Sequence, residues 1–165
     1  MSAGGQAISV RPARRDDWSA ARDLLREVDD LHAQLAPDYF RSAPRSEAEW
    51  QRLLAESHGA VLVAERQHGQ DGQRPVAVLE ARIYDTPDNP GMVPRRRLHI
   101  ETLVVCCNNR RQGIGRRLMS EVVAWGREHG AVEVVLTTWV GNEAAEAFYA
   151  RLGYKVLSRV LYTPI

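Results

Sequence analysis

The sequence is poor in several features that would mark whole classes of protein. Its only cysteines are the neighbours Cys106 and Cys107. Residues adjacent in sequence rarely bridge each other, so we expect free thiols and a reducing, cytoplasmic location. No apolar run approaches the ~20 residues that span a membrane, and the first residues lack the apolar core of a signal peptide. We therefore expect no contact with a membrane.

Charge and histidine spacing argue against two further kinds of partner. The 22 basic and 21 acidic residues leave a net charge of +1, so nothing favours a nucleic acid across the whole surface. The five histidines show no metal-ligand spacing. We expect neither nucleic acid nor metal to bind.

What remains is an ordinary globular composition, 44% hydrophobic and 26% charged. A chain of 165 residues can bury one full core and is too short for two to be expected. The sequence therefore predicts a single domain over residues 1–165, with residues 1–6 flexible.

Hydrophobic periodicity predicts the element order βααβββαβαβ. The predicted strands are 7–11, 60–65, 75–84, 97–106, 132–136 and 154–162, and the predicted helices are 18–35, 46–56, 113–129 and 142–152. The polar residues 68–72 are expected to join two strands as a hairpin. This order predicts the α/β class, with a mixed, partly antiparallel central sheet and helices on both faces.

A glycine turn, Arg110 to Gly115, lies between an apolar run and an amphipathic helix. Two glycines at a helix start leave backbone N–H groups uncovered, and the helix dipole adds positive potential, so the turn suits a phosphate. No Lys-Ser/Thr follows the second glycine, which excludes a P-loop, and the three-glycine dinucleotide spacing is missing. Taken alone, these residues are equally compatible with an ordinary turn.

The order of elements and two motifs together resemble the GCN5-related N-acetyltransferase (GNAT) family. The family's acetyl-CoA motif, Arg/Gln-x-x-Gly-x-Gly/Ala, is matched by Arg110, Gly113 and Gly115. A second family element is matched by Asn142, Ala145, Phe148-Tyr149 and Gly153-Tyr154. The resemblance covers nearly the whole chain and is strongest from Leu98 to Tyr154. It implies a GNAT-like acyl-CoA N-acyltransferase fold, with acetyl-CoA as co-substrate.

The resemblance also implies where acetyl-CoA binds. Backbone amides of the turn would bind the pyrophosphate, and main-chain groups near Leu103 to Val105 would hold the pantetheine arm. Asn142 would hold that arm or order its loop, although it also suits an N-cap. The cofactor-binding residues expected on this basis are Leu103, Val104, Val105, Arg110, Arg111, Gln112, Gly113, Ile114, Gly115, Arg116, Asn142 and Tyr149.

Acetyl transfer to nitrogen needs a neutral amine, yet an alkyl amine has a pKa near ~10, so only about one in a thousand is neutral at pH 7. A base must take the proton, and an acid should meet the departing thiolate. Glu101 is the first candidate for the base and His99 the second; by period two they share a face with Leu103 and Val105. Alternatively, one of the two is a surface residue at a sheet edge or an interface without a catalytic role.

Tyr149 matches the family's thiolate-protonating tyrosine. Alternatively, its ring only packs against neighbouring side chains.

The acceptor is the least constrained part of the prediction. Carboxylates and aromatics mix at the end of the first helix, which suits a cationic amine and equally suits ordinary packing. The candidate acceptor-binding residues are His32, Asp38, Tyr39, Phe40 and Tyr84. A closed pocket lined by Tyr39, Phe40 and Tyr84 would favour a small amine, and an open groove beside Glu101 would favour a peptide N-terminus or lysine. A non-catalytic acyl-CoA sensor is the third alternative, although it would need neither Glu101 nor Tyr149.

Two expectations concern the cysteines and the chain end. No paired base accompanies Cys106 or Cys107, so each is expected to be a small buried apolar residue rather than a covalent nucleophile. Family members are often dimers, and the apolar segment Val156 to Tyr162 suits pairing or exchange between copies. A homodimer is therefore one expected assembly.

Overall fold

The computed structural model describes residues 8–66 and 74–164. The expectations for residues 1–6, for Ala7 and for the turn at 68–72 lie outside these residues. The strands are β1 (Ile8–Pro12), β2 (Gly59–Arg66), β3 (Pro75–Asp85), β4 (Arg96–Val105) and β5 (Glu133–Leu136). The α-helices are α1 (Trp18–Leu35), α2 (Glu47–Ala55), α3 (Ile114–Glu128) and α4 (Glu143–Arg151), and short 3-10 turns cover Arg15–Asp17 and Cys107–Asn109.

Local signals in the sequence set several of the helix boundaries. α1 ends at Leu35, two residues before Pro37, which cannot continue a helix. Before α2, the Ser46 hydroxyl accepts a hydrogen bond from the Glu49 N–H, and the Ser46 N–H donates to the Glu49 carboxylate at 2.6 Å. This reciprocal pair is the capping box that Ser46 and Glu49 predict.

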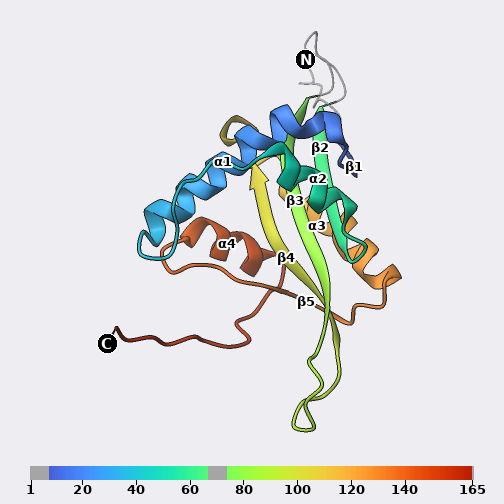
Figure 1. Ribbon diagram of the computed structural model, residues 1–165, viewed down its shortest axis with the longest axis vertical. Coiled ribbons are helices and arrows are strands. Elements are labelled where there is room, and N and C mark those ends of the chain that lie inside the picture. The colour runs from blue at the N-terminus through green and yellow to red at the C-terminus, as the bar shows by residue number, and fades with distance from the viewer. Residues whose placement is uncertain (1–7, 67–73, 165) are drawn as a thin grey trace.

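The five strands form one sheet in the order β1-β2-β3-β4-β5. All neighbouring pairs are antiparallel except β4 and β5, which are parallel. Helices α1 and α2 cover one face of the sheet and α3 covers the other, as Figure 1 shows. The predicted mixed sheet with helices on both faces is confirmed.

Two apolar clusters hold these layers together. Between α3 and the sheet lie Leu79, Leu98, Ile114, Leu118 and Val122, all nearly or fully buried. Between the α1–α2 layer and the opposite face lie Leu25, Trp50, Val63, Val78 and Val104.

β4 contains a β-bulge at Glu101. Glu80 of β3 pairs with Thr102, while the next residue, Ala81, pairs with Ile100, so Glu101 has no cross-strand partner in β3. A bulge reverses the alternation of side chains beyond it. Leu98 and Ile100 therefore face the α3 cluster, and so do Leu103 and Val105 beyond the bulge.

A buried ion cluster fixes the start of the chain to the sheet edge. The Arg11 guanidinium contacts Asp17 and Glu65 at 2.8 Å each, and both carboxylates are almost fully buried. Burial alone would raise the pKa of Asp17, but the hydrogen bonds from Arg11 and from the Arg14 N–H, together with the charges of both arginines, hold that pKa below its usual range. This cluster ties β1, the following 3-10 turn and β2 together.

The predicted final strand at 154–162 is wrong for this chain on its own. Residues 154–164 form neither helix nor strand, and in Figure 1 they run as an extended tail from the end of α4 to the C-terminus. A strand needs a partner for its backbone groups, and the sheet of the same chain provides none to this segment.

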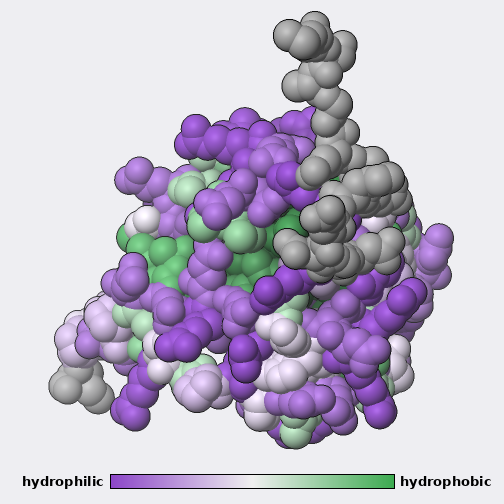
Figure 2. Space-filling view, turned by 90° about the horizontal axis from the view of Figure 1, so that it is seen from above, coloured by the Kyte–Doolittle hydropathy of each residue, from purple (hydrophilic) through white to green (hydrophobic). Residues whose placement is uncertain are grey.

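Seen from above in Figure 2, hydrophilic residues cover most of the face, and apolar residues show in its middle. No helix among the described residues is long and apolar enough to cross a membrane. A cytoplasmic location stays a prediction.

Candidate active site

The glycine turn leads directly into α3. Gly113 is the N-cap residue with φ of 80°, a left-handed conformation that glycine adopts without strain. The first intrahelical bond runs from the Arg117 N–H to the Gly113 carbonyl at 3.0 Å. The N–H groups of the preceding helical residues, Ile114 to Arg116, thus have no partner within the helix, which is the arrangement that binds an anion.

Gly115 brings the turn close to α4. A Cβ atom added at Gly115 would lie 3.2 Å from Cζ of Phe148 and 3.9 Å from Cγ2 of Val105. The end of β4, the start of α3 and the aromatic pair of α4 therefore meet at this residue. These are the segments that carry the two predicted family motifs.

Two polar side chains of the turn brace it rather than project outward. Nε of Arg110 donates to the Val105 carbonyl at 2.9 Å, and the same guanidinium pairs with Glu27 of α1. The Gln112 side-chain oxygen accepts from Arg66 at 2.8 Å. Arg111 and Arg116 are exposed, and Arg111 has φ of 61°. Arg110 and Gln112 thus stabilise the loop through contacts within the protein.

β4 and β5 separate along their length. They pair only from Arg97 to Ile100 on β4, so the stretch from Glu101 to Val105 has no β5 partner among the described residues. The predicted pantetheine residues Leu103, Val104 and Val105 all lie in this stretch. Leu103 and Val105 face α3, and Val104 faces α1 and α2. An unpaired strand segment offers backbone groups to an extended ligand.

α4 positions Asn142 and Tyr149. The Asn142 side chain accepts a hydrogen bond from the Ala145 N–H at 3.2 Å, so it caps α4. The Tyr149 ring packs against Phe148 and Tyr154, with ring centroids 5.1 and 5.5 Å away. Burial raises the pKa of Tyr149 to about 12, so its hydroxyl is protonated at neutral pH.

Glu101, His99 and Tyr84 form a polar group on the opposite side of the sheet from α3. The Tyr84 hydroxyl donates to Oε1 of Glu101 at 3.0 Å, and Nδ1 of His99 lies 3.2 Å from the same oxygen. That nitrogen is buried and its orientation gives no hydrogen bond, so the contact is close but unaligned. Burial and this bond to Glu101 raise the pKa of Tyr84.

The prediction that His99 and Glu101 share a face with Leu103 and Val105 is wrong. His99 pairs with Arg82 across the sheet, and its neighbours Leu98 and Ile100 face α3. Beyond the bulge, Leu103 and Val105 are the residues that face α3. The extra residue at Glu101 shifts the period by one, which a strict period of two cannot anticipate.

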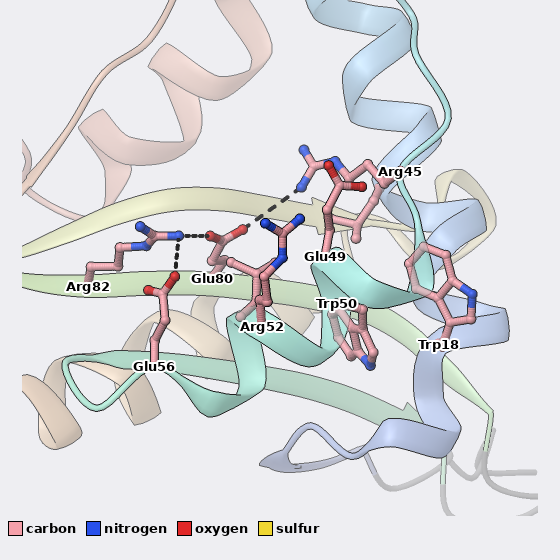
Figure 3. Close-up of a pocket in the computed structure, with 10 residues that line it drawn as sticks. Trp18, Arg45, Glu49, Trp50, Arg52, Glu56, Glu80 and Arg82 are labelled. Carbon is pink, nitrogen blue, oxygen red and sulfur yellow. Dashed lines mark hydrogen bonds and ion pairs between the residues drawn. The ribbon is translucent and has the colours of Figure 1, made fainter.

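A pocket of about 410 Å³ lies among α1, α2 and β3. Figure 3 shows the Glu80 carboxylate between Arg82, at 3.4 Å, and Arg45, at 4.0 Å; the same Nη2 atom of Arg82 also contacts Glu56, at 3.2 Å. Burial raises the pKa of Glu80, the charges of Arg45 and Arg82 oppose this rise, and the charge of Glu101 adds to it. The sequence analysis missed Glu80; its signal was a carboxylate within an otherwise apolar strand.

The five predicted acceptor residues fall into separate groups. The His32 ring lies 5.1 Å from Phe40, while Tyr39 and Phe40 both contact Trp139, at 5.2 and 4.8 Å between ring centroids. We call His32, Tyr39, Phe40 and Trp139 the aromatic cluster. Tyr84 instead lies with His99 and Glu101, and Asp38 is exposed beside the cluster. Trp139, which the sequence analysis missed, joins the loop after α1 to the loop after β5.

The cysteines differ from each other. Cys106 is partly buried against the α1–α2 cluster, as expected of a small apolar residue, whereas Cys107 is exposed and that prediction is wrong for it. Cys107 begins the 3-10 turn Cys107–Asn109, which contains no buried residue.

Comparisons with known proteins agree on one family. The family model described as "Acetyltransferase (GNAT) family" matches residues 23–154. The aminoglycoside N(6')-acetyltransferase type 1 of Acinetobacter genomosp. 13 is 30% identical over 148 residues, which is 88% of each chain.

Solved structures share the fold. A mutant form of the BH1408 protein from Bacillus halodurans superposes with a TM-score of 0.86 at 25% identity, covering 95% of this chain and 99% of that one. An aminoglycoside N-acetyltransferase in complex with CoA has a TM-score of 0.70 at 18% identity, covering 95% and 98%.

Proposed function

The chain belongs to the acetyltransferase (GNAT) family and is therefore an acyltransferase, and from this premise we propose that it transfers the acetyl group of acetyl-CoA to a primary amine of a small molecule. The transfer is direct, with both substrates bound in one ternary complex. The observation that carries this proposal is the bulge at Glu101. It directs a carboxylate to the α1–α2 side of β4, beside the stretch where β4 leaves β5.

Acetyl-CoA fits the groups on the α3 side. The uncovered amides at Ile114 to Arg116 suit a pyrophosphate, and the unpaired stretch Leu103 to Val105 suits an extended pantetheine arm. A structure of a relative in the same fold contains CoA, which supports the same co-substrate here. Bound there, acetyl-CoA supplies the activated acyl group.

The chemistry then assigns a base. Glu101 takes the proton that the acceptor ammonium must lose, and the freed nitrogen lone pair forms the carbon–nitrogen bond as the carbon–sulfur bond breaks. The nitrogen then loses its second proton to become the amide, and the departing CoA thiolate takes up one proton to leave as the free thiol. Tyr84 donates to one oxygen of Glu101 and leaves the other oxygen available. His99 is the second candidate, because its buried Nδ1 has no aligned hydrogen bond and lies next to Glu101.

Tyr149 is the proposed acid. Its hydroxyl is protonated at neutral pH and lies on α4 next to Phe148, which contacts Gly115 of the turn. A pKa of about 12 makes full proton release to a thiolate unfavourable. Tyr149 therefore acts mainly as a hydrogen-bond donor to the sulfur as negative charge develops on it.

The proposed acceptor is a small molecule with more than one amino group. Carboxylates at Glu80 and Glu101 and the aromatic cluster provide charge and ring faces for cations. Relatives named as aminoglycoside acetyltransferases support an amine of this kind.

Release of free thiol from acetyl-CoA tests the proposal, with aminoglycosides, polyamines, amino acids and short peptides as acceptors. We expect aminoglycosides or polyamines to give the highest kcat/KM. Double-reciprocal plots of the initial rate, with either substrate varied at several fixed concentrations of the other, should give intersecting lines, because both substrates bind in one ternary complex. Preference for a peptide would favour the peptide alternative. Tight acetyl-CoA binding with no turnover on any amine would favour a sensor and overturn the proposal.

A further inference from the structure

The pocket among α1, α2 and β3 contains a buried carboxylate with an unused oxygen. The Glu80 side chain is only 10% exposed, and Figure 3 shows its carboxylate in the pocket between Arg82 and Arg45. Oε1 accepts one long hydrogen bond, from Nη2 of Arg82 at 3.4 Å. Oε2 accepts none from the residues that the structure describes, and its ion pair with Nη1 of Arg45 spans 4.0 Å. Buried polar atoms normally have a hydrogen-bond partner, so Oε2 lacks a donor.

The two arginines near Glu80 have closer carboxylate partners of their own. Arg45 donates to both oxygens of Asp29, at 2.7 and 2.8 Å. Arg82 contacts Glu56 at 3.2 Å, which is shorter than its contact with Glu80. Each arginine is therefore already balanced by another carboxylate, and Glu80 receives only a share of their charge.

The other charged residues of the pocket lie at its outer side. Arg52 and Glu49 are exposed residues of α2, three positions apart, so they share one face of the helix and offset each other's charge. Among the described contacts, neither donates a hydrogen bond to Glu80. The pocket thus keeps an unbalanced negative charge at its β3 side.

A second carboxylate without an arginine of its own lies on the neighbouring strand. Glu80 pairs with Thr102, and the bulge residue Glu101 comes directly before Thr102 on β4. Two residues before Glu80, Val78 faces the α1–α2 layer, so Glu80 faces the same side of the sheet as Glu101. Side chains at such neighbouring positions lie about 5–8 Å apart. This spacing matches the two nitrogens of a short diamine.

We infer that Glu80 binds a second nitrogen of the acceptor. One amino group of a short diamine segment lies at Glu101, where the acetyl group is transferred, and the other, as an ammonium, donates to Oε2 of Glu80. The inference rests on the proposed function for the place of the reacting nitrogen. It makes Glu80 a residue that determines specificity, because a monoamine leaves Oε2 without its donor.

Calorimetric titration of the full chain, with CoA absent and present, tests the inference without turnover. The probes are putrescine and butylamine, which share a carbon chain and differ by one amino group. We expect putrescine to bind about tenfold more tightly or better, because a hydrogen bond to a charged group contributes at least that factor. Glu80→Gln should remove the difference by weakening putrescine alone. The matched control is Glu47→Gln, an exposed position of α2 outside the pocket, which should retain it.

Glu80→Asp tests whether the position of the carboxylate sets the preference. The shorter side chain withdraws the carboxylate toward β3, so cadaverine, one carbon longer than putrescine, should become the tighter ligand. Circular dichroism checks that both Glu80 variants fold. If Glu80→Gln does not fold, Glu80→Asp decides, because it retains the charge.

Three results would overturn the inference. They are equal binding of putrescine and butylamine by the wild type, no binding of either, and a preference for putrescine that the Glu80 variants leave unchanged. Failure of the proposed function looks different. A wild type that prefers putrescine through Glu80 but acetylates no amine would reject the proposed function and retain the diamine site.

Discussion

Nδ1 of His99 and Oε1 of Glu101 lie 3.2 Å apart, on side chains that the β4 bulge brings to the same side of the sheet. Glu101 has a second neighbour, Tyr84, which donates to the same oxygen. The carboxylate is thus oriented by the hydrogen bond from Tyr84 and has the His99 ring beside it, and a carboxylate held in this way suits a positioned base.

Replacing Glu101 by Gln removes the proton acceptor and keeps the size of the side chain. We expect kcat/KM for the amine to fall by about 10²–10⁴-fold, the usual contribution of a general base, with little change in acetyl-CoA affinity. Initial rates of thiol release across pH measure the first quantity, and calorimetric titration measures the second. Glu121→Gln, at an exposed position of α3, is the matched control. If Glu101→Gln keeps full activity, Glu101 is not the general base. His99 would then be the base, and His99→Asn should show the large fall in kcat/KM.

Tyr149→Phe tests the proposed donor. With a pKa of about 12, the Tyr149 hydroxyl stays protonated between about pH 6 and 9. The variant should therefore lower kcat by a constant factor over this range, without moving the limbs of the pH profile. Tyr154→Phe, which alters the adjacent ring, serves as a control for packing. Unchanged turnover in Tyr149→Phe would leave this residue a packing role only.

Gly115 tests the contact between the turn and α4. An alanine Cβ would lie 3.2 Å from the Phe148 ring, and valine adds two methyl groups there, so α4 must move. We expect Gly115→Val to raise KM for acetyl-CoA by roughly tenfold or more, which corresponds to about 1.4 kcal/mol of binding free energy. Gly115→Ala should have a smaller effect in the same direction.

Gly113→Ala separates this crowding from backbone strain. No atom lies within 4 Å of the added Cβ at Gly113, but its φ of 80° strains a residue with a side chain. Urea unfolding should show a loss of about 1–2 kcal/mol. If Gly113→Ala and Gly115→Ala raise KM for acetyl-CoA equally and do not differ in stability, crowding by Phe148 does not explain the rise in KM.

Much of the fold was predictable because local signals coincide with the element ends. Three helix ends are marked by residues next to them in the sequence: Pro37 follows α1, the Ser46–Glu49 box precedes α2, and Gly130 adopts the left-handed conformation after α3. Each of these signals depends only on neighbouring residues. The tail was mispredicted for the opposite reason. Its composition favours a strand, but strand formation depends on an available edge, which sequence periodicity does not encode.

In the candidate site, too, local motifs were predictable and contacts between distant segments were not. The motif residues of the turn and α4 meet at Gly115, Phe148 and Val105, and the sequence marks both motifs without showing that they are in contact. The group around Glu80, Arg45 and Arg82 depends on contacts between β3 and the segment preceding α2, which are distant in sequence. Likewise, the bulge that orients Glu101 is visible only in the pairing of two strands.

The Arg11 cluster predicts how stability depends on pH. The folded-state pKa of Asp17 lies below the value of about 3.9 expected in the unfolded chain. Its contribution to the free energy of unfolding is therefore present above about pH 4 and is lost as the pH falls through the folded-state pKa. Arg11→Met leaves Asp17 and Glu65 buried without their cation, and we expect a loss of about 3–5 kcal/mol at neutral pH.

Acid should affect that variant in the opposite sense. Without Arg11, only the Arg14 N–H and the Arg14 charge still oppose the effect of burial, so we expect the pKa of Asp17 to rise above its unfolded value; protonation would then stabilise the fold, and part of the loss would be recovered as the pH falls. Urea unfolding at neutral pH and near pH 4 measures both effects. The matched control is Arg74→Met, which breaks an exposed pair with Asp23 and should cost less than about 1 kcal/mol at either pH. Equal losses in the two variants would mean that the Arg11 cluster contributes no more than a surface ion pair.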